Sequence, residues 1–210
     1  MGYYTDANND GMYDLICMSE EQIYANENSR KLFYGLAELT SIDLSNFKTD
    51  GVKDMVSMFD GCIGLTSLDL SNFDTSQVTD MSSMFNNCSG LTSLDLSNFN
   101  TSQVKNMYSM FSSCSGLTSL DLSNFNTSKV INMEDMFKQC NELITIYVSE
   151  YNSATQKGWT TINVTNSSSM FSSCTKLVGG NGTKFNSTHT DATYARIDTA
   201  ENPGYLTKKE

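Results

Sequence analysis

The chain has 210 residues and a formal net charge of −11 at pH 7, with 24 acidic and 13 basic side chains. No stretch concentrates the basic residues, so we expect nucleic acid and anionic membranes to be repelled, and basic proteins or cations are the compatible partners. No apolar run reaches the roughly 18 residues that a membrane helix needs, so we expect no membrane insertion by this segment. The start MGYYTDANND lacks the charged and apolar parts of a signal peptide.

A block of 26 residues recurs almost unchanged, as in LTSLDLSNFDTSQVTDMSSMFNNCSG from Leu65 to Gly90. Further copies begin at Leu39, Leu91, Leu117 and Leu143. A fixed period of this length indicates a repeat array, in which each unit buries its apolar face only against its neighbours. We therefore predict a single elongated domain with capped ends.

Residues 1–38 are predicted to be a divergent N-terminal capping coil, because Tyr13 and Ile16 lie one period before Leu39 and Ile42.

Within this cap, the segment DANNDGMYD has the oxygen spacing of the first part of an EF-hand loop. The candidate calcium ligands are Asp6, Asn8, Asp10 and Asp14. The twelfth position is Cys17 rather than the usual Glu, so a hairpin turn on Asp10-Gly11 is the alternative. Calcium is the one cofactor that the sequence suggests, and none is required.

Residues 39–176 hold five repeats of this type. Leu65, Leu68 and Leu70 have the L-x-x-L-x-L spacing that predicts a short parallel strand with inward leucines. Steps of three and four residues link Val78, Met81, Met84, Phe85 and Cys88 and predict a short helix or 3₁₀ turn. The predicted fold is an α/β repeat solenoid, a right-handed coil with one such strand and one such helix or turn per repeat.

Five of the six cysteines occupy one slot of successive repeats, in the phrase MFxxC: Cys62, Cys88, Cys114, Cys140 and Cys174. No His accompanies them and no C-x-x-C occurs, so we interpret them as a column of buried free thiols. A second column is predicted to stack as a spine at the corner after each strand: Phe47, Phe73, Phe99 and Phe125.

The fifth repeat carries an insertion at about residues 149–165, and Leu177 follows Leu143 by one period plus eight residues. Loops on rigid scaffolds often hold binding residues, so Tyr151 and Trp159 are candidate contacts for a protein or a glycan. Alternatively, Trp159 covers the apolar edge of its own loop. After Leu177 the repeat pattern dissolves, and residues 177–210 are predicted to be a β-type C-terminal cap.

One outward column is acidic: Asp43, Asp69, Asp95 and Asp121. Strand stacking would place these carboxylates ~4.8 Å apart, which forms a stripe that attracts a basic partner or divalent cations. The alternative is that they keep the exposed face soluble and discourage edge association.

The copies of LTSLDLSNFDTSxVTDMSSMFxxCSxL resemble the BspA-like leucine-rich repeats of bacterial surface proteins, in the 26-residue variety also seen in mycoplasma-type lipoproteins. The ending LVGGNGT…TYARIDTAENPGYLT is similar to the terminal cap that follows such arrays. The resemblance implies an extracellular, cell-surface bacterial protein that binds host or matrix proteins in adhesion.

The chain has no Ser/His/Asp order, no HExxH and no phosphate-binding glycine loop, so we do not expect an enzyme. Two further interpretations stay open: a structural spacer or stalk within a larger surface protein, and a glycan-binding module. A monomer is expected.

Overall fold

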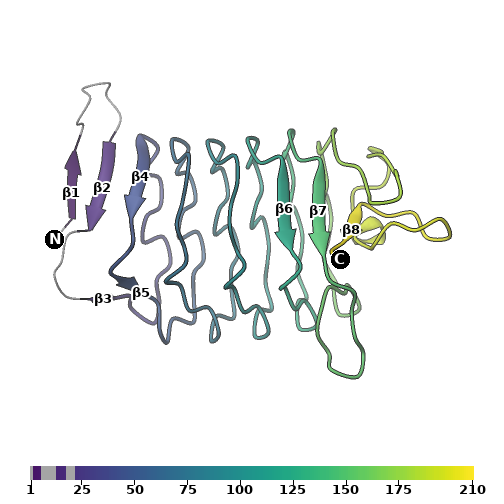
Figure 1. The fold of residues 1–210 in the computed structure, drawn as a ribbon, viewed down its shortest axis with the longest axis horizontal. Coiled ribbons are helices and arrows are strands. Elements are labelled where there is room, and N and C mark those ends of the chain that lie inside the picture. The colour runs from purple at the N-terminus through teal and green to yellow at the C-terminus, as the bar shows by residue number, and fades with distance from the viewer. Residues whose placement is uncertain (1, 6–12, 18–21) are drawn as a thin grey trace.

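The computed structural model describes residues 2–5, 13–17 and 22–210, with side chains from residue 22 onward. Successive repeats lie side by side along the long axis, and the chain ends lie toward opposite ends of the array (Figure 1). The strands are β1 (Gly2–Thr5), β2 (Tyr13–Cys17), β3 (Ile23–Tyr24), β4 (Leu39–Asp43), β5 (Phe47–Lys48), β6 (Ser119–Leu122), β7 (Thr145–Val148) and β8 (Leu206–Lys208). They form three small sheets, β1-β2-β4, β3-β5 and β6-β7-β8.

Strands from successive coils pair in parallel, as the repeat predicts, but not in every coil. β6 pairs with β7, and β7 with β8, whereas the segments around Leu68 and Leu94 form no regular strand although both leucines are buried. The Asp69 and Asp95 carboxylates accept the backbone N–H groups two residues later. Asp43 and Asp121 do the same in coils that form strands, so this turn is common to all four coils. The prediction of one strand per repeat is therefore wrong for the coils of Leu68 and Leu94.

The first coil pairs with the second in a register that differs from the 26-residue spacing. Tyr13 lies opposite Leu39 as expected, but Leu15 rather than Ile16 lies opposite Ile42. The irregularity falls between Tyr13 and Asp14, where one extra residue shifts the pairing.

The sequence predicted a short helix or a 3₁₀ turn in each repeat, and the described repeats contain turns rather than a helix. In the described part of the chain, the single helical element is the 3₁₀ helix η1 (Ala192–Tyr194). The stretch from Met81 to Cys88 consists of overlapping turns instead, in which Met84 N–H donates to Met81 O and Cys88 N–H to Phe85 O. None of the described helices is long and apolar enough to cross a membrane.

Alternate N–H groups of this stretch donate to the next coil. Ser83, Phe85 and Asn87 donate to the carbonyls of Tyr108, Met110 and Ser112, at 2.7–3.0 Å. Bonds within the coil thus alternate with bonds between coils. A helix would satisfy all these donors locally.

Left-handed backbone makes this alternation possible. Ser83 and Asn87 have φ of 55° and 58°, and the equivalent slots of the next coil, Ser109 and Ser113, have 51° and 60°. A β-turn with positive φ at its third residue reverses the direction of the chain. Ser83 and Asn87 are the third residues of two successive turns, so the chain reverses every four residues. The apolar side chains between them acquire the three- and four-residue steps that resemble a helix.

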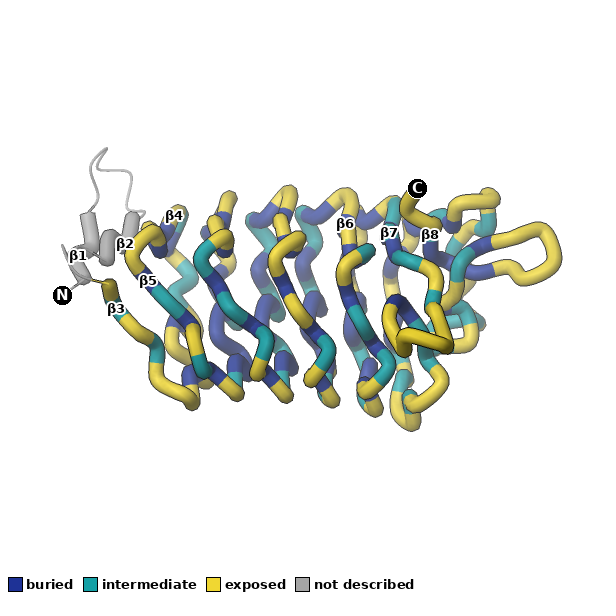
Figure 2. Tube along the Cα trace, turned by 60° about the horizontal axis from the view of Figure 1, so that its bottom comes forward, coloured by how far each residue is buried: buried dark blue, intermediate teal, exposed yellow. Residues whose placement is uncertain are grey.

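The core is built from columns that run along the array (Figure 2). The phenylalanines of the MF phrase form a continuous stack, with ring centroids 5.2–5.8 Å apart: Phe33, Phe59, Phe85, Phe111, Phe137 and Phe171. Tyr205 closes the stack edge-on against Phe171 at 5.2 Å. The predicted corner phenylalanines are buried too, but the stacked spine is this other set.

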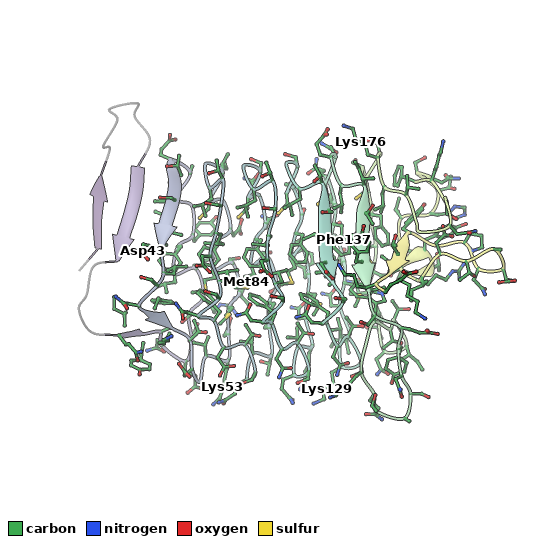
Figure 3. The ribbon with its side chains drawn as sticks, viewed as in Figure 1. Asp43, Lys53, Met84, Lys129, Phe137 and Lys176 are labelled. Atoms are coloured by element: carbon green, nitrogen blue, oxygen red, sulfur yellow. The ribbon has the colours of Figure 1, made fainter. Side chains whose placement is uncertain are left out.

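Met84 and Phe137 lie inside the array, while Lys53, Lys129 and Lys176 lie along its margins (Figure 3).

The cysteine column is buried, as predicted, and its described members are free thiols. Each Sγ donates to a phenylalanine carbonyl of the preceding coil, as Cys88 does to Phe59 O at 3.1 Å. Burial raises the pKa of Cys62 to about 11 and that of Cys174 to about 12.

Polar side chains at the corners also join neighbouring coils. The buried Thr101 hydroxyl donates to Asn126 O at 3.1 Å and accepts Asn126 N–H at 2.8 Å. The Asn124 amide donates to the carbonyls of Leu96 and Phe99 at 2.8 and 2.7 Å. These bonds between coils were not predicted, because the same residues also suit local turns.

The C-terminal cap is organised around the buried Asp198. Burial alone would raise the pKa of this carboxyl, but hydrogen bonds from Thr183, Gly204 and Asn181 outweigh it and lower the pKa. A carboxylate with four donors is therefore the polar centre of the cap.

Replacing Thr101 by Val should lower the free energy of unfolding by about 1–3 kcal/mol, because the partly buried Asn126 N–H loses its acceptor. Thr101→Ser is the control, since it keeps the hydroxyl and loses one buried methyl, worth about 0.8 kcal/mol. Urea unfolding followed by circular dichroism measures both. Equal stability of the two variants would contradict a stabilising role for these bonds between coils.

Ellman's reagent should label at most one thiol of the native protein, Cys17, and all six in urea. The five column thiols are buried with raised pKa, so little reactive thiolate is present at pH 8. Rapid labelling of two or more thiols in the native state would show that the column is open.

Candidate functional site

The repeat pattern resumes at Trp159, which occupies the slot of Phe125 in the preceding coil. Thr160 N–H donates to the Thr127 hydroxyl at 2.7 Å, just as Asn126 N–H donates to Thr101. The inserted residues are therefore 151–158, a narrower segment than the 149–165 predicted from the sequence. The order Trp-Thr-Thr-Ile-Asn-Val from residue 159 parallels Phe-Asn-Thr-Ser-Lys-Val from residue 125, which is the signal that could have located the boundary.

The inserted segment, residues 151–158, is an anchored hairpin and is called the hairpin below. Asn152 N–H donates to Lys157 O at 2.8 Å, and Lys157 N–H donates to Asn152 O at 3.4 Å. At its base Gly158 has φ of 100°, and a Cβ there would lie 2.5 Å from Glu150 O. Only glycine fits this position, so the base of the hairpin is sterically defined.

Trp159 follows the hairpin in the chain and fixes its C-terminal end in the core. Its side chain is 5 % exposed, and its indole N–H donates to Ala195 O in the C-terminal cap at 2.9 Å. The indole is therefore held in the core, where it does not face a partner. Tyr151, the other candidate contact, is partly exposed on the hairpin itself.

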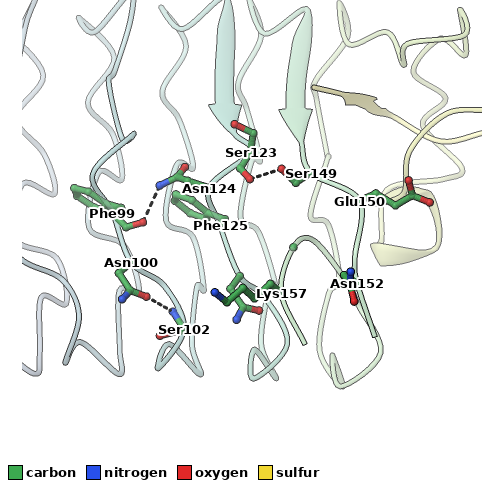
Figure 4. A pocket seen from close by; sticks show the side chains of 12 residues that line it. Phe99, Asn100, Ser102, Ser123, Asn124, Phe125, Ser149, Glu150, Asn152 and Lys157 are labelled. Carbon is green, nitrogen blue, oxygen red and sulfur yellow. Dashed lines mark hydrogen bonds between the residues drawn. The ribbon is translucent and has the colours of Figure 1, made fainter. Parts of the chain in front are cut away.

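A cavity of about 540 Å³ lies between the hairpin and the corners of the two preceding coils (Figure 4). We call it the hairpin groove. Its lining residues are Phe99, Asn100, Ser102, Ser123, Asn124, Phe125, Asn126, Ser149, Glu150, Asn152, Lys157 and Gly158. This volume is within the range of ligand-binding pockets.

Two charged side chains line the hairpin groove. Glu150 is paired with Lys208 at 2.7 Å, and its hydrogen bond and charge interaction with that lysine lower the pKa of the carboxyl. Lys157 extends from the hairpin, and its ammonium has no hydrogen-bond or ion-pair partner among the described residues. The Phe99 and Phe125 rings lie behind the polar groups, only 2 % and 0 % exposed.

A second cavity, of about 530 Å³, lies on the same corner of the earlier coils. Its lining is more acidic, with Asp50 and Asp74 beside Lys48 and the exposed Tyr24. Lys48 donates to Asn72 Oδ1 at 2.9 Å, so this lysine already has a partner. The two cavities thus lie at the same position of the repeat, in different coils, but differ in charge.

The acidic column lies on the surface as its alternation predicts, with all four carboxylates exposed. The hydrogen bonds from the Ser45, Ser71 and Ser97 backbone and side chain lower the pKa of Asp43, Asp69 and Asp95. These carboxylates therefore stay ionised at neutral pH.

Asp121, the last residue of the acidic column, forms an ion pair. Its carboxylate pairs with Lys209 at 2.8 Å, and the ammonium of Lys209 also lies 4.8 Å from the ring centre of Tyr147. Burial would raise the pKa of Asp121, but hydrogen bonds from Lys209 and Ser123 outweigh it and lower the pKa. The free part of the acidic column is therefore the part nearer the N-terminus.

The candidate calcium ligands Asp6, Asn8 and Asp10 lie outside the described residues, as does the side chain of Asp14. Among the side chains that the structure describes, no group of three or more His, Cys, Asp or Glu residues is arranged to hold a metal ion.

These features define a leucine-rich-repeat-like repeat protein, with inward leucines and parallel pairing between coils. The chain matches the family described as "Mycoplasma protein of unknown function, DUF285" over residues 27–148 and 118–203. The chain belongs to this family, whose description gives no enzymatic activity.

A crystal structure of a leucine rich repeat protein of T. pallidum aligns with 17 % identity and a TM-score of 0.44. The alignment covers 84 % of this chain and 77 % of that one. A search of curated proteins finds none that matches.

Replacing Trp159 by Ala should lower the free energy of unfolding by about 3–5 kcal/mol, because it empties a buried aromatic slot. Trp159→Phe restores the side chain of the other coils and loses mainly the bond to Ala195 O, about 0.5–1.5 kcal/mol. Chemical denaturation measures both. A loss below about 1 kcal/mol for the alanine variant would place the indole outside the core.

Proposed function

We propose that this chain is a non-catalytic binding domain that holds a protein partner at the hairpin and the adjoining corner of the array. The observation that carries the proposal is the hairpin groove, formed where the hairpin interrupts an otherwise regular array. A uniform repeat offers the same few groups in every coil, whereas a specific site needs different groups that converge. The hairpin supplies such groups, and its fixed base holds them on a rigid scaffold.

We further propose the setting that the sequence resemblance implies. The array is a right-handed, BspA-like leucine-rich-repeat solenoid at the bacterial cell surface, where it takes part in adhesion to host or matrix proteins. The acidic column and the net charge of −11 support attraction of partners with basic surfaces over longer distances. Site-specific contact is then made at the hairpin groove.

A variant that lacks residues 151–158 tests this proposal. The deletion joins Glu150 to Trp159, restores the 26-residue period, and is expected to fold because the preceding coil has that length. We expect the immobilised wild-type domain to capture a defined extracellular protein and the deletion variant to lose at least about tenfold in affinity, about 1.4 kcal/mol. Binding is measured by surface plasmon resonance, with and without calcium.

Asp69→Ser/Asp95→Ser is the matched variant on the acidic column. It should slow association and reduce the salt dependence while it leaves the hairpin groove intact. No capture by folded wild-type protein, or equal capture by the deletion variant, would contradict the proposal and favour a structural spacer.

A further inference from the structure

We propose that the hairpin groove binds an acidic side chain carried by an extended peptide segment of the protein partner. The inference rests on the proposed function and names the chemistry of the ligand. It follows from the hydrogen-bonding groups that the fold leaves unused in the hairpin groove. They include four groups that can only donate, the Nδ2 groups of Asn100, Asn126 and Asn152 and the ammonium of Lys157.

The asparagine amides of the hairpin groove are oriented by their own backbone. Asn100 Oδ1 accepts Ser102 N–H at 3.1 Å, and Asn126 Oδ1 accepts Ser128 N–H at 3.1 Å. Asn152 Oδ1 accepts two backbone N–H groups in the same way, from residues 154 and 155. Each oxygen is used locally, whereas the Nδ2 donors have no acceptor in the described part of the chain and remain for a ligand.

Lys157 adds the charge. Most other lysines of the array are paired, as Lys53 is with Glu27 at 2.8 Å and Lys129 is with Gln103 at 2.8 Å. The one carboxylate in the lining, Glu150, is already neutralised by Lys208. One cation and three amide donors therefore face the same space and suit a carboxylate with neighbouring carbonyl acceptors.

The second cavity does not share this donor character. Asp74 occupies the slot of Asn100 in the preceding coil and forms the same turn, accepting Ser76 N–H at 2.8 Å. In the second cavity that slot therefore presents a carboxylate oxygen, which would repel an acidic ligand. The same turn thus presents a carboxylate acceptor at Asp74 and an amide donor at Asn100 in the next coil.

A peptide fits this lining better than a saccharide does. Sugars are commonly held against exposed aromatic faces, but the Phe99 and Phe125 rings are almost fully buried. Asn100 and Asn126 repeat along the array axis, so the ligand runs across successive coils. A peptide supplies backbone carbonyls in such a row and one carboxylate for Lys157.

The test uses ¹⁵N-labelled protein and two capped pentapeptides, Gly-Gly-Glu-Gly-Gly and Gly-Gly-Gln-Gly-Gly, with glucuronic acid as the saccharide probe. We expect the Glu peptide to shift the side-chain amide resonances of Asn100, Asn126 and Asn152 in a saturable way. The Gln peptide should bind about tenfold more weakly. Lys157→Gln should reduce Glu-peptide binding by a similar factor, and the matched Lys129→Gln should leave it unchanged.

Asn100→Asp/Asn126→Asp should abolish Glu-peptide binding without unfolding the array, because Asp74 shows that the turn accepts Asp. Equal binding of both peptides, or full binding by Lys157→Gln, would overturn the inference. Tighter binding of glucuronic acid than of the Glu peptide would also overturn it, in favour of a saccharide. If the hairpin deletion loses the protein partner while the Asn→Asp variant keeps it, the proposed function stands and this inference fails.

Discussion

Hydrogen bonds between successive coils are the constraint on which the rest of the structure depends. One coil alone cannot satisfy its backbone, because alternate N–H groups from Met81 to Cys88 point along the array to carbonyls of the next coil. The left-handed residues, the buried threonines and the corner asparagines all serve this arrangement. The stability of the array therefore comes from contacts between neighbouring coils, as in other repeat proteins.

The same constraint explains where variation is tolerated. An insertion inside the stacked turns would break bonds on both sides, whereas the hairpin leaves the array at a corner and pairs with itself. Trp159 and Gly158 then return the chain to the common register. The groups of the hairpin groove are thus added to the array without a change in its core.

Much of the fold could be predicted from the sequence, because it follows from burial. The repeat, the inward leucines and the cysteine column all show as apolar positions at fixed spacing. The turns could not be distinguished from a helix, since alternating left-handed residues give the same steps of three and four. Serine at a positive φ, as at Ser83, carries no sequence signal comparable to glycine.

The candidate site was predicted only in part. The insertion marked the right region, but the position of Trp159 in the slot of Phe125 was not predicted, because eight extra residues interrupt the 26-residue spacing. The groups that define the hairpin groove, Asn100 and Asn126, lie in ordinary repeat positions. Their importance depends on the hairpin that stands beside them, which spacing alone does not show.

The most direct test of this account is NMR detection of scalar coupling across hydrogen bonds in the stacked turns. The structure predicts a correlation from the Phe85 amide nitrogen to the carbonyl carbon of Met110 in the next coil, across a 3.0 Å bond. A correlation from Phe85 to Met81 within the same coil would instead show a helix and would contradict the account.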